Sequence, residues 1–157
     1  MTGMAPPPRF PLLEVALHAI APDDAERIIV DWITRRDKQY LSVCTADTLL
    51  QCHDDPRLAA VVNGAGLAVP DGMPLVWIGR LKGFPAHRIY GPDLMLRLCD
   101  RGRTRGLRHF FYGGTEPLLQ VLEQRLKARF PGLLLAGAWA PPFRPLSPDE
   151  ECDVAAR

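Results

Sequence analysis

The sequence predicts an α/β fold of the Rossmann-like kind, with a mainly parallel sheet and helices on both faces. Short strand-like runs of apolar residues alternate with longer amphipathic segments along the chain, an order that is typical of parallel sheets. The 157 residues suffice for one domain with a hydrophobic core. Hydrophobic residues make up 47% of the chain and charged residues 24%, as in ordinary globular proteins.

The first part of the chain is expected to contain a leader, a strand, a helix and a second strand. Four prolines in residues 1–11 favour a flexible leader, so the domain is expected to occupy residues 12–157. Its first eight residues (12–19) are predicted to form a strand. Apolar residues recur at helical spacing over residues 22–39, and residues 40–45 are rich in β-forming residues.

The central segments continue this alternation. Residues 47–65 predict a helix or a helical hairpin, and residues 66–70 predict a strand. A further helix is expected to begin at Met73 or Pro74. Residues 91–106 predict another helix, which has a proline in its first turn.

The C-terminal segments predict two more strands. Residues 107–114 form a compact aromatic run that stops at two glycines, and residues 115–132 predict an amphipathic helix. Residues 133–140 predict the next strand, and residues 141–157 a loop and the opening of a helix. Because another strand normally follows such a helix, we expect the C-terminal part of the domain to be missing.

Composition narrows the function classes. A formal net charge of +1 argues against an extended nucleic-acid surface. The four cysteines and four histidines show no spacing of metal ligands, so no metal is assigned. Residues 1–13 lack the pattern of a secretory signal, which favours a cytoplasmic location. The longest apolar run is far shorter than the ~20 residues that span a bilayer, so any membrane contact is expected to be peripheral.

Candidate ligand-binding segments follow from the fold class. Ligands of open α/β sheets bind beyond the carboxyl ends of the strands. This rule selects residues 45–47, 70–72 and 113–115 and the loop after Ala138.

Asp71 has two interpretations. Its carboxylate ends a strand, before a glycine that lets the backbone turn, and there it could accept a proton from an attacking hydroxyl. Alternatively, Asp71 caps the helix that begins near Met73. Local sequence alone favours the cap.

The other candidates also have two interpretations each. Gly113 and Gly114 precede a helix and can bind phosphate or simply form a tight turn. Thr45 and Asp47 can bind a ligand hydroxyl or cap the following helix, which is the commoner role. Arg88 is either a phosphate clamp or a solvated surface cation.

Six motifs, in this order, resemble those of the WecG/TagA/CpsF glycosyltransferases. They are Thr45-Ala46-Asp47, Asn63-Gly64-Ala65, Val69-Pro70-Asp71-Gly72-Met73-Pro74, Arg88-Ile89-Tyr90-Gly91-Pro92-Asp93-Leu94, Phe110-Phe111-Tyr112-Gly113-Gly114 and Pro141-Pro142-Phe143-Arg144-Pro145-Leu146. Each motif is weak alone, whereas the ordered set is specific. The resemblance covers about residues 12–155.

The resemblance implies an inverting transferase that moves an N-acetylmannosamine-type sugar or another hexose from a UDP donor. The implied acceptor is a polyprenyl-diphosphate-linked sugar in the synthesis of cell-surface polysaccharide. No metal or other cofactor is implied, and Asp71 matches the family's catalytic base. The implied substrate-binding residues are Thr45, Asp47, Asn63, Gly72, Arg88, Gly91, Asp93, Gly113 and Gly114. Asp47 stands where the family usually has asparagine, so contacts with the donor are expected to differ there.

The implied partners are the UDP-sugar, the lipid-linked acceptor and the inner face of the plasma membrane, and the resemblance also allows a homo-oligomer. Two other interpretations stay open. One is a truncated, non-catalytic domain that binds nucleotide sugars. The other is an unrelated nucleotide-binding α/β domain, which would make the ordered motifs a coincidence.

Overall fold

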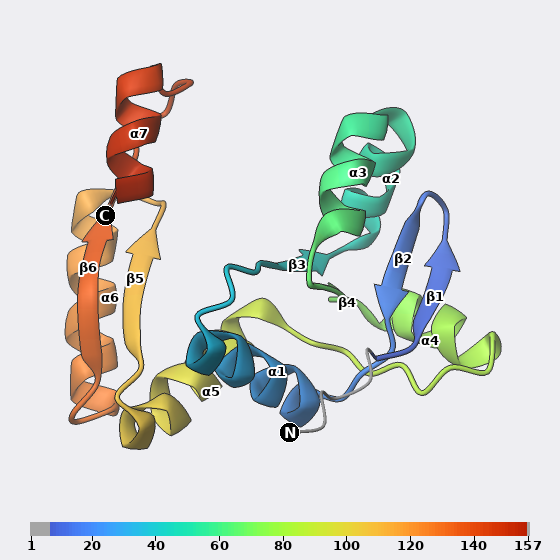
Figure 1. Ribbon diagram of the computed structural model, residues 1–157, viewed down its shortest axis with the longest axis horizontal. Helices are drawn as coiled ribbons and strands as arrows, with labels where there is room; N and C mark the ends of the chain where they lie inside the picture. The colour runs from blue at the N-terminus through green and yellow to red at the C-terminus, as the bar shows by residue number, and fades with distance from the viewer. Residues whose placement is uncertain (1–6, 157) are drawn as a thin grey trace. The chain divides into compact units, whose positions relative to one another are not determined.

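The computed structural model describes residues 7–156 and divides into two compact units, the first ending at Leu96 and the second beginning at Arg97 (Figure 1). The strands of this part of the chain pair two by two: β1 (Arg9–Leu12) with β2 (Val15–His18), β3 (Leu41–Cys44) with β4 (Leu67–Pro70), and β5 (Arg108–Tyr112) with β6 (Leu134–Trp139). The first pair is antiparallel, and the other two are parallel. The predicted α/β class with mainly parallel pairing is therefore confirmed.

Helices separate most successive strands, as the sequence predicts. They are α1 (Pro22–Arg35), α2 (Ala46–Asp54), α3 (Pro56–Gly64), α4 (Met73–Leu81), α5 (Gly91–Arg101), α6 (Glu116–Arg129) and α7 (Pro148–Ala156), with a short 3-10 helix at Gly102–Arg105. The segment 47–65 forms the predicted helical hairpin, which consists of α2 and α3. Asp55 lies between the two helices and caps α3 by accepting a hydrogen bond from the Arg57 amide at 2.8 Å. Helix α1 ends before residue 39, since Arg36 adopts a left-handed conformation with φ of 59°.

The expected leader is wrong for residues 9–11. These residues form β1, which pairs with β2 around a turn at Leu13 and Glu14. Phe10 is fully buried and its ring packs against Phe84, with 5.7 Å between the ring centroids. Proline is tolerated in a strand at a sheet edge, so Pro11 does not prevent this pairing. Residues 1–6 of the leader lie outside the described residues.

The core of the first unit surrounds β4, all four residues of which are buried. On one side β4 pairs with β3, and on the other it meets His18 of β2. The Ala68 amide donates to His18 Nδ1 at 2.9 Å, and the same nitrogen lies 3.3 Å from the Ala68 carbonyl. Burial, followed by the positive charge of Arg9, lowers the pKa of His18.

In the second unit, α6 packs against β6 through buried apolar residues. Leu119 and Leu126 of α6 are buried, and Phe130 and Leu133 close the helix end. The predicted strands over 107–114 and 133–140 are confirmed as β5 and β6.

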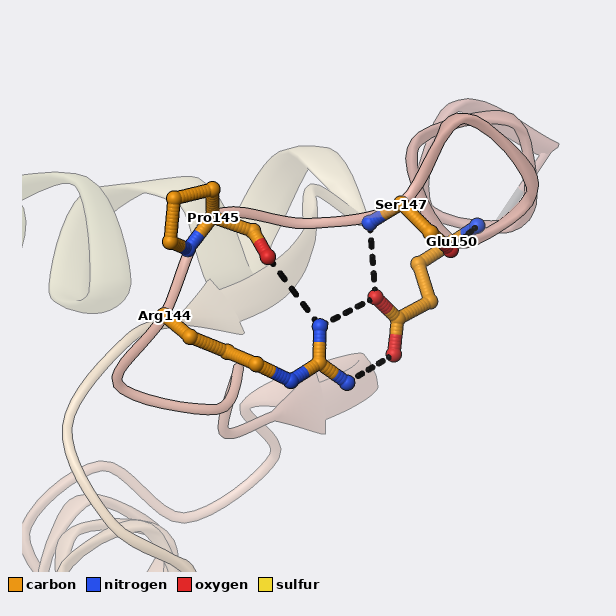
Figure 2. Close-up of polar contacts among 4 residues, drawn as sticks. All are labelled: Arg144, Pro145, Ser147 and Glu150. Atoms are coloured by element: carbon orange, nitrogen blue, oxygen red, sulfur yellow. Dashed lines mark hydrogen bonds and ion pairs between the residues drawn. The ribbon is translucent and has the colours of Figure 1, made fainter.

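The loop before α7 is held by Arg144 and Glu150, as Figure 2 shows. The two guanidinium nitrogens Nη1 and Nη2 donate to the two carboxylate oxygens at 2.8 and 2.7 Å, and the Ser147 amide adds a third hydrogen bond at 2.8 Å. The hydrogen bonds from Arg144 and the Ser147 backbone lower the pKa of Glu150 to about 2. Residues 144–150 thereby join the loop after β6 to the first turn of α7.

Candidate functional site

The carboxyl ends of β3 and β4 lie together at one edge of the first unit. Cys44 is paired with Pro70, and the Asp71 amide donates to the Cys44 carbonyl at 2.8 Å. Thr45 and Asp71 therefore follow neighbouring strand ends. The Ile89 amide donates to the Pro70 carbonyl at 2.9 Å, which brings residues 87–90 to the same edge.

Asp71 and Arg88 form an ion pair at this edge. The Nε and Nη2 atoms of Arg88 each lie 3.2 Å from Oδ1 of Asp71. The Asp71 side chain is 12% exposed, whereas the Arg88 side chain is 46% exposed. The guanidinium carbon also lies 4.7 Å from the centroid of the Tyr90 ring, a cation–π contact. The carboxylate is thus sheltered but reachable, and the cation that covers it is near solvent.

The interpretation of Asp71 as a helix cap is wrong. The N-cap of α4 is Gly72, and no side chain caps this helix. Burial raises the pKa of the neighbouring Cys44 thiol, which keeps that group neutral. Asp71 and Arg88 form the ion pair at the end of β4, which lies beside the end of β3.

Gly72 leaves open space beside Asp71. Its φ of −177° is extended backbone, which any residue adopts. A Cβ atom added there would meet Pro74 Cδ at 3.8 Å, an ordinary contact. Neither the backbone nor the packing requires glycine, so the open space favours the approach of a ligand to the N-terminus of α4.

Thr45 caps α2, as the commoner interpretation expects. Its Oγ1 accepts from the Thr48 amide, and its own amide donates to Thr48 Oγ1, both at 3.2 Å. Asp47 accepts a hydrogen bond from Gln51 Nε2 at 2.6 Å. Both residues are exposed near the end of β3, and their contact with a ligand stays a prediction.

Asn63 is not at this edge. It precedes β4, whereas Asp71 follows it. Its Oδ1 accepts from the Ala16 amide at 2.9 Å, and its Nδ2 donates to the Glu14 carbonyl at 2.7 Å. The amide group is therefore used to hold the β1–β2 hairpin, and we assign Asn63 to the fold rather than to the ligand-binding edge.

Gly91 and Asp93 begin α5. A Cβ atom on Gly91 would lie 3.6 Å from Val43 Cγ2, so Gly91 is beside β3 and close to the edge. Asp93 is an exposed residue in the first turn of α5. The structure brings Thr45, Asp71, Gly72, Arg88 and Gly91 to one edge, and the sequence reasoning missed Tyr90 beside them.

Gly113 and Gly114 belong to the second unit and follow β5. Their φ angles are 117° and 70°, conformations that favour glycine, so the tight turn explains both. The Gly113 amide donates to the Trp139 carbonyl at 3.0 Å, and Thr115 caps α6 by accepting from the Leu118 amide at 3.4 Å. A phosphate contact at these glycines stays a prediction.

The first unit also contains a cavity of about 320 Å³ whose lining does not include Asp71. It is lined by Pro7, Pro8, Ala19, Ile20, Asp24, Arg27, Ile28 and Pro85. Within residues 7–156, no group of three or more His, Cys, Asp or Glu side chains is placed to hold a metal ion. Across the same residues, each helix is too short or too polar to cross a membrane.

Comparison with known proteins gives two results. The family model described as "Glycosyl transferase WecG/TagA/CpsF family" matches residues 10–157. An N-acetylglucosaminyldiphosphoundecaprenol N-acetyl-beta-D-mannosaminyltransferase from Bacillus spizizenii is 37% identical over 84 residues. This match covers 53% of the chain and 33% of the relative's length.

Proposed function

The chain belongs to the WecG/TagA/CpsF family of glycosyl transferases, and we propose that it transfers a sugar from a UDP donor to a polyprenyl-diphosphate-linked sugar. The name of the Bacillus spizizenii relative describes transfer of an N-acetylmannosaminyl group to such an acceptor, and we propose the same class of donor sugar here. The observation that carries the proposal is the pairing of Asp71 with Arg88 beyond the ends of two parallel strands.

Asp71 is the general base in this proposal. Its carboxylate accepts the proton of the acceptor hydroxyl while the hydroxyl oxygen forms a bond to the anomeric carbon of the donor. The bond from that carbon to the UDP oxygen breaks, and its electron pair leaves with the diphosphate. One displacement of this kind inverts the anomeric centre. A side chain that is 12% exposed is sheltered from bulk water but open to a bound hydroxyl.

Arg88 holds the leaving diphosphate. A guanidinium binds phosphate oxygens through paired donors, and it stabilises the negative charge that develops as UDP leaves. When the diphosphate takes over the donors of Arg88, Asp71 loses its present partner and is released for proton transfer. Arg88 and the uncapped N-terminus of α4 then supply the positive charge, and the proposed reaction needs no cofactor.

The proposed acceptor carries a polyprenyl chain, which belongs in a bilayer. We therefore propose that the chain works at the cytoplasmic face of the plasma membrane as a peripheral protein. Its partners in this setting are the UDP-sugar and the lipid-linked acceptor. Homo-oligomer formation is compatible with this arrangement.

A second candidate is a domain that binds nucleotide sugars without catalysis. The ion pair with Arg88 occupies Oδ1 of Asp71, and a domain that only binds a diphosphate needs the cation but no free base, which is the observation that favours this candidate. Both candidates predict UDP binding at the Arg88 edge, but they differ in turnover.

The test is release of UDP from a panel of UDP-sugars, with and without a short-chain lipid-diphosphate acceptor. UDP-N-acetylmannosamine, its uronic acid, UDP-glucose and UDP-galactose form the panel. Acceptor-dependent release from one donor supports the transferase. Binding of UDP without release from any donor supports the second candidate, and failure to bind UDP contradicts both.

A further inference from the structure

Helix α4 exposes an apolar stripe next to the proposed site. Met73, Trp77 and Leu81 are 39%, 57% and 87% exposed. They recur every four residues, so they lie along one face of the helix. Because the three side chains share one face, they form an apolar patch, and exposed apolar patches mark interaction surfaces whereas single scattered apolar residues do not.

Packing fixes which face of α4 turns outward. Leu75, Val76 and Gly79 are buried on the opposite face. A Cβ atom on Gly79 would lie 2.8 Å from Ala86 Cβ and from Phe10 Cζ, so the helix is seated closely on these two residues. Figure 1 shows α4 beside the β1–β2 hairpin that carries Phe10. Rotation of α4 to hide Trp77 would break this contact.

Between Asp71, which pairs with Arg88, and Asp93, the chain carries basic but no acidic residues. From Gly72 to Pro92 the sequence contains Arg80, Lys82, His87 and Arg88 and no aspartate or glutamate. Arg80 is tied by Nε to the Ala86 carbonyl at 2.9 Å, and Lys82 follows the helix end. Helices that lie in a membrane interface combine such basic residues with exposed Trp and Leu side chains.

Another exposed leucine of the first unit has different surroundings. Leu50 of α2 is 58% exposed, close to the exposure of Trp77. However, α2 carries the acidic residues Asp47 and Asp54, and Asp55 follows it. An anionic surface would attract α4 and repel α2.

We propose that Met73, Trp77, Leu81, Arg80 and Lys82 (the α4 surface) form the face that docks on an anionic lipid bilayer. The occupant is the headgroup region of the bilayer, into which the three apolar side chains insert. The stripe begins two residues after Asp71, so docking brings the proposed base to an acceptor whose lipid part lies in the same bilayer. This inference rests on the proposed function for its role, but membrane binding can be measured without turnover.

The experiment is co-sedimentation of the full chain with vesicles of phosphatidylglycerol and phosphatidylcholine in equal parts, and with phosphatidylcholine vesicles alone. We expect binding to the anionic vesicles that weakens with added salt. Trp77→Ser combined with Leu81→Ser should lower the partition coefficient roughly tenfold. Trp77→Phe keeps an aromatic ring and should retain most of the binding. The matched control is Leu50→Ser combined with Val61→Ser, and far-UV circular dichroism checks that every variant is folded.

Several outcomes would overturn the docking surface. One is an equal fall in vesicle binding in the Leu50→Ser and Val61→Ser control. The others are equal binding of the wild type to both kinds of vesicle, and no vesicle binding by the wild type. A wild-type dimer that Trp77→Ser with Leu81→Ser dissociates, without vesicle binding, would assign the stripe to a second copy instead. Turnover of a short-chain, water-soluble acceptor separates the two proposals, because the α4 variants should leave it unchanged. If no donor turns over but the vesicle results hold, the docking surface stands and the proposed function fails.

Discussion

Arg88 places two donors on a single carboxylate oxygen of Asp71, with Nε and Nη2 each 3.2 Å from Oδ1. The two residues are 17 positions apart, and the hydrogen bond from the Ile89 amide to the Pro70 carbonyl brings them together. The proposed base is therefore covered by the group that we expect to bind the diphosphate. In the proposed mechanism, this one contact couples proton transfer to binding of the donor.

Replacement of Arg88 should weaken binding of the nucleotide. Arg88→Gln removes the positive charge, and we predict that the Kd for UDP rises roughly 10- to 100-fold. Arg88→Lys should not restore full affinity, because an ammonium group lacks the planar fork that reaches Asp71 and stacks on Tyr90. Titration calorimetry with UDP measures both, with Arg125→Gln on α6 as the control. Unchanged affinity in Arg88→Gln would remove Arg88 from the site.

Replacement of Asn63 should affect stability rather than ligand binding. Asn63→Ala removes the partners of the Ala16 amide and the Glu14 carbonyl. We predict a loss of about 1–3 kcal/mol in the free energy of unfolding, measured in urea. Affinity for UDP should stay at the wild-type value. If Asn63→Ala kept the wild-type stability but lost UDP binding, Asn63 would be a ligand-binding residue instead.

Acid should destabilise the first unit through His18. Burial lowers the pKa of His18 below its ordinary value of 6.5, so the unfolded chain takes up a proton at a higher pH than the folded chain. The free energy of unfolding should therefore fall as the pH drops below 6.5 toward the lowered pKa. In His18→Asn, the amide oxygen can still accept from the Ala68 amide, but this part of the pH dependence of the free energy of unfolding should vanish. The measurement is the free energy of unfolding in urea at a series of pH values. The same pH dependence in His18→Asn and the wild type would contradict this role of His18.

Glu150 should titrate far below an ordinary glutamate. Its folded pKa is about 2 against an ordinary value of 4.5, so its contribution to stability is present above 4.5 and is lost as the pH falls through about 2. Arg144→Gln removes the main cause, and the pKa should move back toward 4.5. Carboxyl ¹³C NMR measures the titration directly. A wild-type midpoint near 4.5 would show that the contact in Figure 2 does not persist in solution.

The sequence was sufficient to predict most elements, because the patterns that define them are local. The helical hairpin at residues 47–65 and the strands β5 and β6 follow from periodicity, capping residues and glycines. The sequence does not predict strand β1, because the four prolines of residues 1–11 favour a leader, whereas the burial of Phe10 depends on α4 and Phe84. Such long-range packing leaves no local signal.

The candidate site was only partly predictable, for a related reason. Local sequence favoured Asp71 as a cap, since the Arg88 that pairs with it lies far along the chain. Asn63 matched a family motif, but its hydrogen-bond partners are residues of a hairpin 47 and 49 positions away. The difference between Gly72, which needs no special φ, and Gly114, which has φ of 70°, is a property of the folded backbone.

The most direct measurement is the rate of UDP release by Asp71→Asn, with UDP-N-acetylmannosamine and a short-chain lipid-diphosphate acceptor. Asparagine keeps the size of the side chain but cannot accept the proton of the acceptor hydroxyl. Asp54→Asn, an exposed carboxylate at the end of α2, is the matched control. We predict that turnover falls roughly 100- to 10,000-fold in Asp71→Asn and stays normal in the control, while both bind UDP. Wild-type turnover in Asp71→Asn would contradict the assignment of Asp71 as the catalytic base.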